Sequence, residues 1–128
     1  MSQISGAIDI HHHFVPERII TEGKRHGRAL GIEVSEENDG SIRFSFNGGP
    51  KYALQQGLTD IEPRFRMMEQ GRIAFAALDP STNLIGYELR GEQAESWCRV
   101  YNECVQEFVQ KYPERFTAMA AVPLQEPA

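Results

Sequence analysis

The spacing of apolar residues along the chain changes several times, and each change predicts a new element. In residues 7–13 apolar and polar side chains alternate, a period of two that is typical of a β-strand. Pro16 follows, and proline is favoured in the first turn of a helix. We therefore expect a helix over residues 17–30, in which Gly23 and Gly27 are weak points.

Two alternating segments after this helix predict a β-hairpin. They cover residues 32–34 and 41–46, and the dipeptide Asp39-Gly40 between them is a common turn sequence. Asparagine, glycine and proline end the second segment, and residues 51–58 show no repeating pattern. We expect these last residues to form a loop.

A second helix is expected from about Thr59 to Gly71. Thr59 and Glu62 fit a capping box, in which a hydroxyl and a carboxylate satisfy free backbone donors. Gly71 suits a left-handed residue that ends the helix. Residues 73–78 are then continuously apolar, which is typical of a strand buried on both faces.

The third helix has the clearest pattern, and Tyr112-Pro113 stops it. Its apolar residues recur at helical spacing and are Ala94, Trp97, Cys98, Tyr101, Val105, Phe108, Val109 and Tyr112. Residues 116–122 form a second apolar run, which predicts another buried strand. Strands that alternate with helices indicate an α/β fold with a parallel sheet.

Composition and charge narrow the classes of partner. The 128-residue chain is 41% hydrophobic and 24% charged, which is ordinary for a globular domain. Its net charge of −5 disfavours binding to nucleic acid or to an acidic membrane surface. No segment approaches the roughly 20 apolar residues of a membrane span, and no apolar leader is visible. We expect a soluble cytoplasmic protein whose Cys98 and Cys104 remain free thiols.

The sequence Asp9-Ile10-His11-His12-His13 carries the clearest candidate chemistry. Residues two apart on a strand face the same way, so His11 and His13 project together and His12 points to the other face. Two imidazoles at the end of a strand can share one divalent ion, and Asp9 is placed to orient one of them. The competing interpretation is a solvated strand tip or a tag remnant, although a well-patterned strand precedes the histidines.

Several segments in this order resemble the amidohydrolase superfamily. Residues 8–17 are similar to its first strand and metal-binding histidines. The chain further resembles the branch that contains aminocarboxymuconate-semialdehyde decarboxylase, γ-resorcylate decarboxylase and several lactone hydrolases. The segments that carry this likeness are residues 60–78, 101–103, 112–116 and 122–127. The resemblance thus extends over nearly the whole chain.

The resemblance implies a partial (β/α)8 TIM-type barrel, of which residues 1–128 form the N-terminal part with about three βα units. The hairpin would then be an insert after the first helix. His11 and His13 would bind Zn2+ or another divalent transition metal, together with a His and an Asp from later strands. The one histidine after His13 is His26, which we expect on the surface of the first helix. Because a complete barrel takes about 250 residues, we expect a truncated product or one piece of a larger protein.

The chain departs from the branch in two places. The helix end that usually reads Met-Asp-x-x-Gly is Met-Glu-Gln-Gly-Arg in residues 68–72, so the glycine comes one residue early. The semialdehyde decarboxylases carry an arginine just after the hairpin that binds a substrate carboxylate, and Asn47 stands at the nearest position here. This second departure weakens the case for the same substrate.

Phe14, Asp79 and Ser81 are the candidate substrate contacts. Phe14 follows the metal motif, and the other two follow the second buried strand, at the end where barrel active sites form. The competing interpretations are core packing for Phe14 and a plain turn for Asp79 and Ser81.

The function expected first is that of a metal-dependent decarboxylase of a small aromatic or unsaturated carboxylic acid, of which this chain is the N-terminal part. The resemblance implies that the metal and its water help to protonate the carbon that loses carbon dioxide. A metal-dependent lactone or ester hydrolase is one alternative, and a truncated, catalytically inactive fragment is the other. The sequence assigns no catalytic acid or base. Uncovered apolar strands would favour a homo-oligomer or association with another chain.

Overall fold

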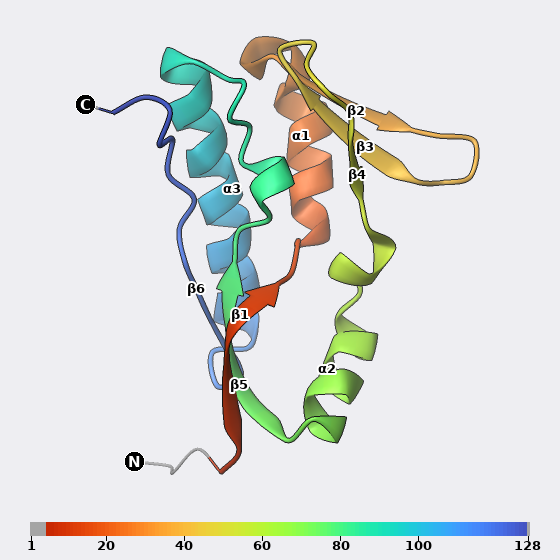
Figure 1. Cartoon of the computed structure of the whole chain (residues 1–128), viewed down its shortest axis with the longest axis vertical. Coiled ribbons are helices and arrows are strands. Elements are labelled where there is room, and N and C mark those ends of the chain that lie inside the picture. The colour runs from red at the N-terminus through yellow and green to blue at the C-terminus, as the bar shows by residue number, and fades with distance from the viewer. Residues whose placement is uncertain (1–4, 128) are drawn as a thin grey trace.

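The strands of the molecule divide into two separate sheets. The computed structural model describes residues 5–127, whose arrangement is shown in Figure 1. In chain order the elements are β1 (Ala7–His13), α1 (Glu17–Leu30), β2 (Ile32–Glu36), β3 (Ile42–Phe46), β4 (Tyr52–Leu54), the 3-10 turn η1 (Gln56–Leu58), α2 (Ile61–Gln70), β5 (Ile73–Asp79), the 3-10 turn η2 (Thr82–Leu84), α3 (Gly91–Lys111) and β6 (Phe116–Ala118).

The first sheet is parallel throughout, as the alternation of strands and helices predicted. Its strand order is β1-β5-β6. The register pairs His13 with Asp79, so the last residues of β1 and β5 are neighbours. The structure therefore confirms an α/β fold with a three-stranded parallel sheet, which is consistent with part of a barrel.

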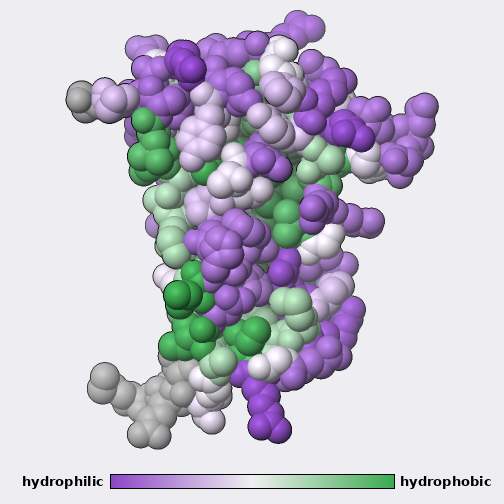
Figure 2. All heavy atoms as spheres, viewed as in Figure 1, coloured by the Kyte–Doolittle hydropathy of each residue, from purple (hydrophilic) through white to green (hydrophobic). Residues whose placement is uncertain are grey.

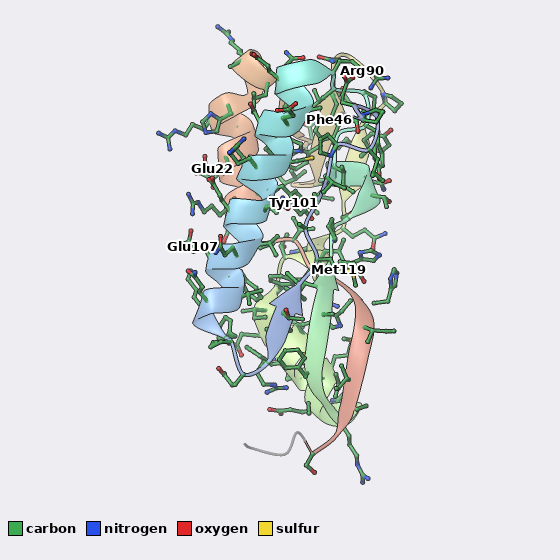
Figure 3. The ribbon with its side chains drawn as sticks, turned by 90° about the vertical axis from the view of Figure 1, so that its left-hand side faces the viewer. Glu22, Phe46, Arg90, Tyr101, Glu107 and Met119 are labelled. Carbon is green, nitrogen blue, oxygen red and sulfur yellow. The ribbon has the colours of Figure 1, made fainter. Side chains whose placement is uncertain are left out.

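Helix α3 lies along one face of this sheet (Figure 3), and α2 packs against the same small core. That core contains Phe14, Met68, Ala76, Leu78 and Phe116. On β5, Ala76 and Leu78 are buried while their neighbours are only partly so. The prediction that residues 73–78 are buried on both faces is wrong, because the described residues fully cover only one face of the strand.

Strand β6 is shorter than the sequence predicted. The apolar run over residues 116–122 predicted a buried strand, but the strand ends at Ala118 and Phe116 is its one buried residue. Met119 and Val122 are each 49% exposed. Among residues 5–127 no strand pairs with the outer edge of β6. Met119 and Val122 therefore stay exposed, while Phe116 and Ala121 of the same run are buried.

The second sheet is antiparallel, with β3 between β2 and β4. Strands β2 and β3 correspond to the two alternating segments, but the prediction of a loop over residues 51–58 is wrong, because this segment contains β4 and η1. Three residues are too few to show a period. Strand β4 is held by pairing of Tyr52 with Phe44, by burial of Leu54 and by a hydrogen bond from the Tyr52 hydroxyl to the Glu88 carboxylate.

The larger core joins the second sheet to α3. Phe44 and Phe46 of β3 each place their rings with centroids 6.3 Å from that of Trp97. Trp97 is fully buried, and its Nε1 donates a hydrogen bond to the Leu84 carbonyl at 2.7 Å. Because Leu84 belongs to η2, this bond fixes the turn that follows β5 against the helix.

Helix α2 begins and ends differently from the prediction. Asp60, not Thr59, is its N-cap, and its carboxylate accepts a hydrogen bond from the Glu62 N–H at 3.2 Å. The Thr59 hydroxyl instead donates to a carbonyl of η1. Gly71 has a φ of −80°, and Arg72, with a φ of 53°, takes the left-handed conformation that was predicted for the glycine.

Helix α1 has the predicted bounds, and α3 ends directly before Tyr112-Pro113 as predicted. Helix α3 carries the regular apolar spacing that predicted it, whereas α1 was predicted from Pro16 before it. Across residues 5–127, no helix combines the length and the apolar character needed to cross a lipid bilayer.

Candidate metal centre

The three consecutive histidines lie at the end of β1, beside the last residue of β5. The pairing of β1 with β5 shifts register between Asp9 and His12, an irregularity that interrupts strict alternation of side chains. The rings of His11 and His13 nevertheless lie together, with centroids 4.7 Å apart in an edge-to-face arrangement. The His11 side chain is 76% exposed, whereas His12 is buried. The predicted opposition of His12 to the other two is confirmed.

Asp79 is the acidic residue whose carboxylate lies beside the ring of the exposed His11. Its Oδ2 lies 3.0 Å from Nδ1 of His11, and the same oxygen accepts a hydrogen bond from the His12 backbone N–H at 3.1 Å. The Asp79 carbonyl lies 3.3 Å from Nδ1 of His13. Because the Asp79 side chain is only 11% exposed, its carboxylate is held in place between strands.

Asp9 takes a different partner from the one that the sequence suggested. Its Oδ2 accepts a hydrogen bond from Nδ1 of the buried His12 at 2.8 Å, and its Oδ1 accepts one from the His11 backbone N–H at 3.0 Å. The hydrogen bond from His12 lowers the pKa of Asp9. The prediction that Asp9 orients His11 or His13 is corrected, because the interrupted alternation turns its carboxylate toward His12.

The imidazoles of His11 and His13 at this strand end are suited to be two of the ligands of a divalent ion. Two neighbouring imidazoles beside a carboxylate are the groups that bind zinc and related transition metals. Among residues 5–127, however, no three His, Cys, Asp or Glu side chains are arranged as a group that could hold a metal. Within these residues, no third side-chain ligand of this kind joins His11 and His13.

A cavity of about 230 Å3 opens beside His13. It is lined by His13, Ala53, Leu54, Gln55, Leu58, Ser81, Thr82, Asn83 and Leu84. Its wall thus combines the end of β1, the segment around β4 and η1, and the turn after β5. No lining residue is an arginine, lysine or carboxylate, so histidine, hydroxyl and amide groups supply its side-chain polarity.

The structure separates the three predicted substrate contacts. Ser81 lines the cavity beside His13, and its backbone N–H donates to the Tyr101 hydroxyl at 3.2 Å. Asp79 contacts the histidines and is not among the residues that line this cavity. Phe14 is buried in the small core, with its ring centroid 4.4 Å from that of Phe108.

Among the polar residues that line the cavity, Gln55 and Asn83 are two that the sequence did not single out. Gln55 lies in the segment that was expected to be a loop, and Asn83 lies in η2. Neither belongs to a motif or to a regular pattern. Only the fold, which brings these two turns to the same strand end, identifies them.

Two of the motif residues behind the family resemblance stabilise the fold. The Arg115 guanidinium donates hydrogen bonds to the carbonyls of Ala74 at 3.1 Å and Ile73 at 3.4 Å on β5. The Asn102 side chain accepts from the Ala121 N–H at 2.7 Å and donates to its carbonyl at 2.9 Å. These contacts hold the segments on either side of β6 in place.

His26 lies on α1, and the two cysteines lie on α3. His26 is 39% exposed at its side chain, with Nε2 lying 3.0 Å from Oε2 of Glu22, so it is a surface residue as expected. Cys98 and Cys104 are both free and buried. Burial raises the pKa of the Cys104 thiol to about 11 and also raises that of Cys98.

No protein-family model matches the chain, but solved structures share its fold. A Staphylococcus aureus protein assigned provisionally to the amidohydrolases matches with a TM-score of 0.56 and 18% identity, over 93% of this chain and 29% of its own. A dihydroxybenzoic acid decarboxylase from a Polaromonas species contains bound manganese and the inhibitor 2-nitroresorcinol. It matches with a TM-score of 0.57 and 20% identity, over 95% of this chain and 31% of its own.

A third structure is 5-carboxyvanillate decarboxylase from Novosphingobium aromaticivorans, in complex with manganese and 4-hydroxy-3-methoxy-5-nitrobenzoic acid. It matches with a TM-score of 0.57 and 19% identity, over 98% of this chain and 38% of its own. The chain thus spans only about a third of the length of these structures. At such low identity the likeness is one of fold. The chain adopts the fold of part of these amidohydrolase and decarboxylase structures.

Proposed function

We propose that this chain is the N-terminal part of a metal-dependent decarboxylase that acts on a small aromatic or unsaturated carboxylic acid. The observation that carries the proposal is the pair of imidazoles from His11 and His13, which lie side by side at a strand end next to a cavity. The shared fold with two manganese-containing decarboxylases supports it. In this proposal residues 1–128 belong to an amidohydrolase-type barrel, and β2 to β4 are an insert between α1 and α2.

His11 and His13 would hold the ion in this enzyme. Zinc or another divalent transition metal suits imidazole ligands, and manganese is the ion in two of the solved structures of the same fold. When bound, such an ion supplies Lewis acidity toward an oxygen of the substrate or toward water. In this proposal the described residues contribute two nitrogen ligands and the cavity wall. The other ligands of the ion would come from later strands of the barrel.

The cavity beside His13 would hold the body of the substrate. Its apolar residues, Leu54, Leu58 and Leu84, suit a small unsaturated or aromatic ring. Ser81, Gln55 and other uncharged groups suit hydroxyl or methoxy substituents on that ring. Because no cationic side chain lines the cavity, the substrate carboxylate is expected to point to the metal rather than into the cavity.

Metal binding by the purified chain is the decisive measurement. Calorimetric titration with Mn2+ and with Zn2+ should show one ion bound per chain, and a His11→Ala/His13→Ala double variant should lose that binding. A His26→Ala variant is the matched control, because it removes an imidazole of α1 that is paired with Glu22. Equal binding by all three proteins, or binding by none, would contradict the proposed half-site.

The type of reaction requires a second assay. Release of carbon dioxide from a hydroxylated benzoic acid would support the decarboxylase, whereas lactone or ester hydrolysis would support the alternative enzyme. The same histidine pair serves either reaction, because a divalent ion both polarises oxygen atoms and activates water. A chain that binds metal but shows neither activity would be the inactive fragment.

A further inference from the structure

One residue of β5 contacts all three consecutive histidines of β1. Asp79 reaches Nδ1 of His11 with its carboxylate at 3.0 Å, the backbone N–H of His12 with the same oxygen at 3.1 Å, and Nδ1 of His13 with its carbonyl at 3.3 Å. The two proposed metal ligands are therefore both approached at Nδ1, and both by the same residue.

The contact to His13 determines where its proton lies. A backbone carbonyl can only accept a hydrogen bond, so Nδ1 of His13 must be the donor in this pair. A neutral imidazole carries one N–H, which leaves the lone pair on Nε2. Nε2 is then the nitrogen of His13 that is free to bind a metal.

The contact to His11 acts in the same sense through the side chain. An ionised carboxylate 3.0 Å from Nδ1 of His11 repels a lone pair on that nitrogen, so its negative charge favours the hydrogen there. This carboxylate is a fixed acceptor, because it is 11% exposed and already accepts from the His12 backbone. Since the His11 side chain is 76% exposed, its Nε2 remains accessible.

We propose that Asp79 is a positioning residue that fixes the tautomer of both His11 and His13, so that each presents Nε2 to a divalent ion. This role deepens the proposed function, on which its metal-binding part rests, and replaces the substrate contact that the sequence suggested for Asp79. It also separates the two histidines, because the side chain of Asp79 acts on His11 and its backbone acts on His13.

The test is the nitrogen NMR spectrum of the histidine rings in the metal-free protein. It is recorded at the same mildly alkaline pH for every protein. Single His11→Ala and His13→Ala variants assign the signals. Both rings should be protonated at Nδ1 in the native chain. Asp79→Ala should return His11 to the tautomer mixture of a free imidazole and leave His13 unchanged, while Asp79→Asn, which keeps an acceptor oxygen, should largely preserve the native state of His11.

Metal affinity gives an independent readout. Loss of a partner that orients a metal-bound histidine typically weakens metal binding by about 10–100-fold, so Asp79→Ala should bind Mn2+ or Zn2+ that much more weakly. Native rings protonated at Nε2 would overturn the inference even if no variant folds. Correct tautomers without metal binding would refute the proposed function alone, and metal binding with the wrong tautomers would refute the role of Asp79 alone.

Discussion

Tyr101 connects the middle of α3 to the turn after β5. Its ring is buried, and its hydroxyl accepts a hydrogen bond from the Ser81 N–H at 3.2 Å. Burial raises the pKa of Tyr101 from 10.0 to about 12. The folded state therefore favours the protonated phenol and resists its ionisation.

Stability should consequently depend on Tyr101 at alkaline pH. Between pH 10 and about 12 the unfolded chain releases the phenolic proton while the folded chain keeps it, so the free energy of unfolding falls by about 2–3 kcal/mol as pH rises through this window. Below pH 10 this contribution is fully present. Urea unfolding across this range should show the loss in the native protein.

Tyr101→Phe is the comparison variant. It should be less stable at neutral pH by about 0.5–1.5 kcal/mol, because the Ser81 N–H loses its acceptor. Because the variant lacks the phenol, the native protein's advantage should shrink and then reverse between pH 10 and 12. A constant difference would mean that the phenol is not shielded from water.

The rate at which the two cysteines are alkylated should depend on unfolding of the chain, because both thiols are buried in the folded state. Burial raises the pKa of Cys104 from 9.0 to about 11, which lowers its thiolate fraction roughly 100-fold. Alkylation at neutral pH should therefore be slow in the native chain and should accelerate in step with the urea transition. Single Cys98→Ala and Cys104→Ala variants separate the two thiols, and rapid labelling without denaturant would contradict this expectation.

At the residue scale the sequence predicted the histidine pair but not its partner. His11 and His13 follow from the spacing of a strand, which is a local property. The contact with Asp79 depends on which strand pairs with β1 and in what register, so spacing alone could not reveal it. Asp9 was misplaced for the related reason that strict alternation does not survive the register shift.

Gly27 shows why an apparently weak helix position is needed. The sequence marked it as a poor helix former, but in the structure it lies where α1 meets β2. A Cβ added there would lie 2.4 Å from the Ile32 carbonyl oxygen, a backbone atom that cannot turn away. The absence of a side chain allows the close approach of helix and strand.

Gly27→Ala should therefore destabilise the fold. Alanine gains about 1 kcal/mol in helix propensity, but the clash should outweigh this gain and leave a net loss of about 1–3 kcal/mol. Gly57→Ala is the matched control, because a Cβ there meets no atom within 4 Å, and its effect should stay within about 0.5 kcal/mol. Thermal or urea unfolding measures both, and a stabilised Gly27→Ala variant would contradict the packing argument.

At the element scale, prediction succeeded where the pattern was long. Helix α3 carries several turns of regular apolar spacing, whereas β4 has three residues and shows none. The start of α2 was misplaced because Thr59 and Asp60 are both good capping residues. Only the geometry of η1, which occupies the Thr59 hydroxyl, decides between them.

At the scale of the whole molecule, apolar side chains remain on the surface of the parallel sheet and the segment after it. They are Ile8 (55% exposed), Ile10 (72%), Met119 (49%), Val122 (49%) and Leu124 (70%). Figure 2 shows hydrophobic surface along the side of the molecule where this sheet lies. The prediction that residues 116–122 form a buried strand failed here, because a local apolar run does not reveal which neighbours are present.

This surface should make the isolated chain self-associate. Unpaired strand edges and exposed apolar residues favour contact between copies. Sedimentation over a range of concentrations should show association, and an Ile8→Lys/Ile10→Lys double variant should reduce it. Thr21→Lys, which adds a charge at an exposed position of α1, is the control. A native chain that stays monomeric and unfolds in one sharp transition would contradict this prediction.

The division into two sheets has a consequence for how such a protein can change over evolution. The histidines belong to the parallel sheet, whereas Ala53, Leu54 and Gln55 of the cavity wall come from the antiparallel unit and the residue after it. The two sheets share no strand. Replacement of the antiparallel unit can thus alter the wall of the cavity while the histidines at the end of β1 are inherited unchanged, provided that the aromatic packing against Trp97 is kept.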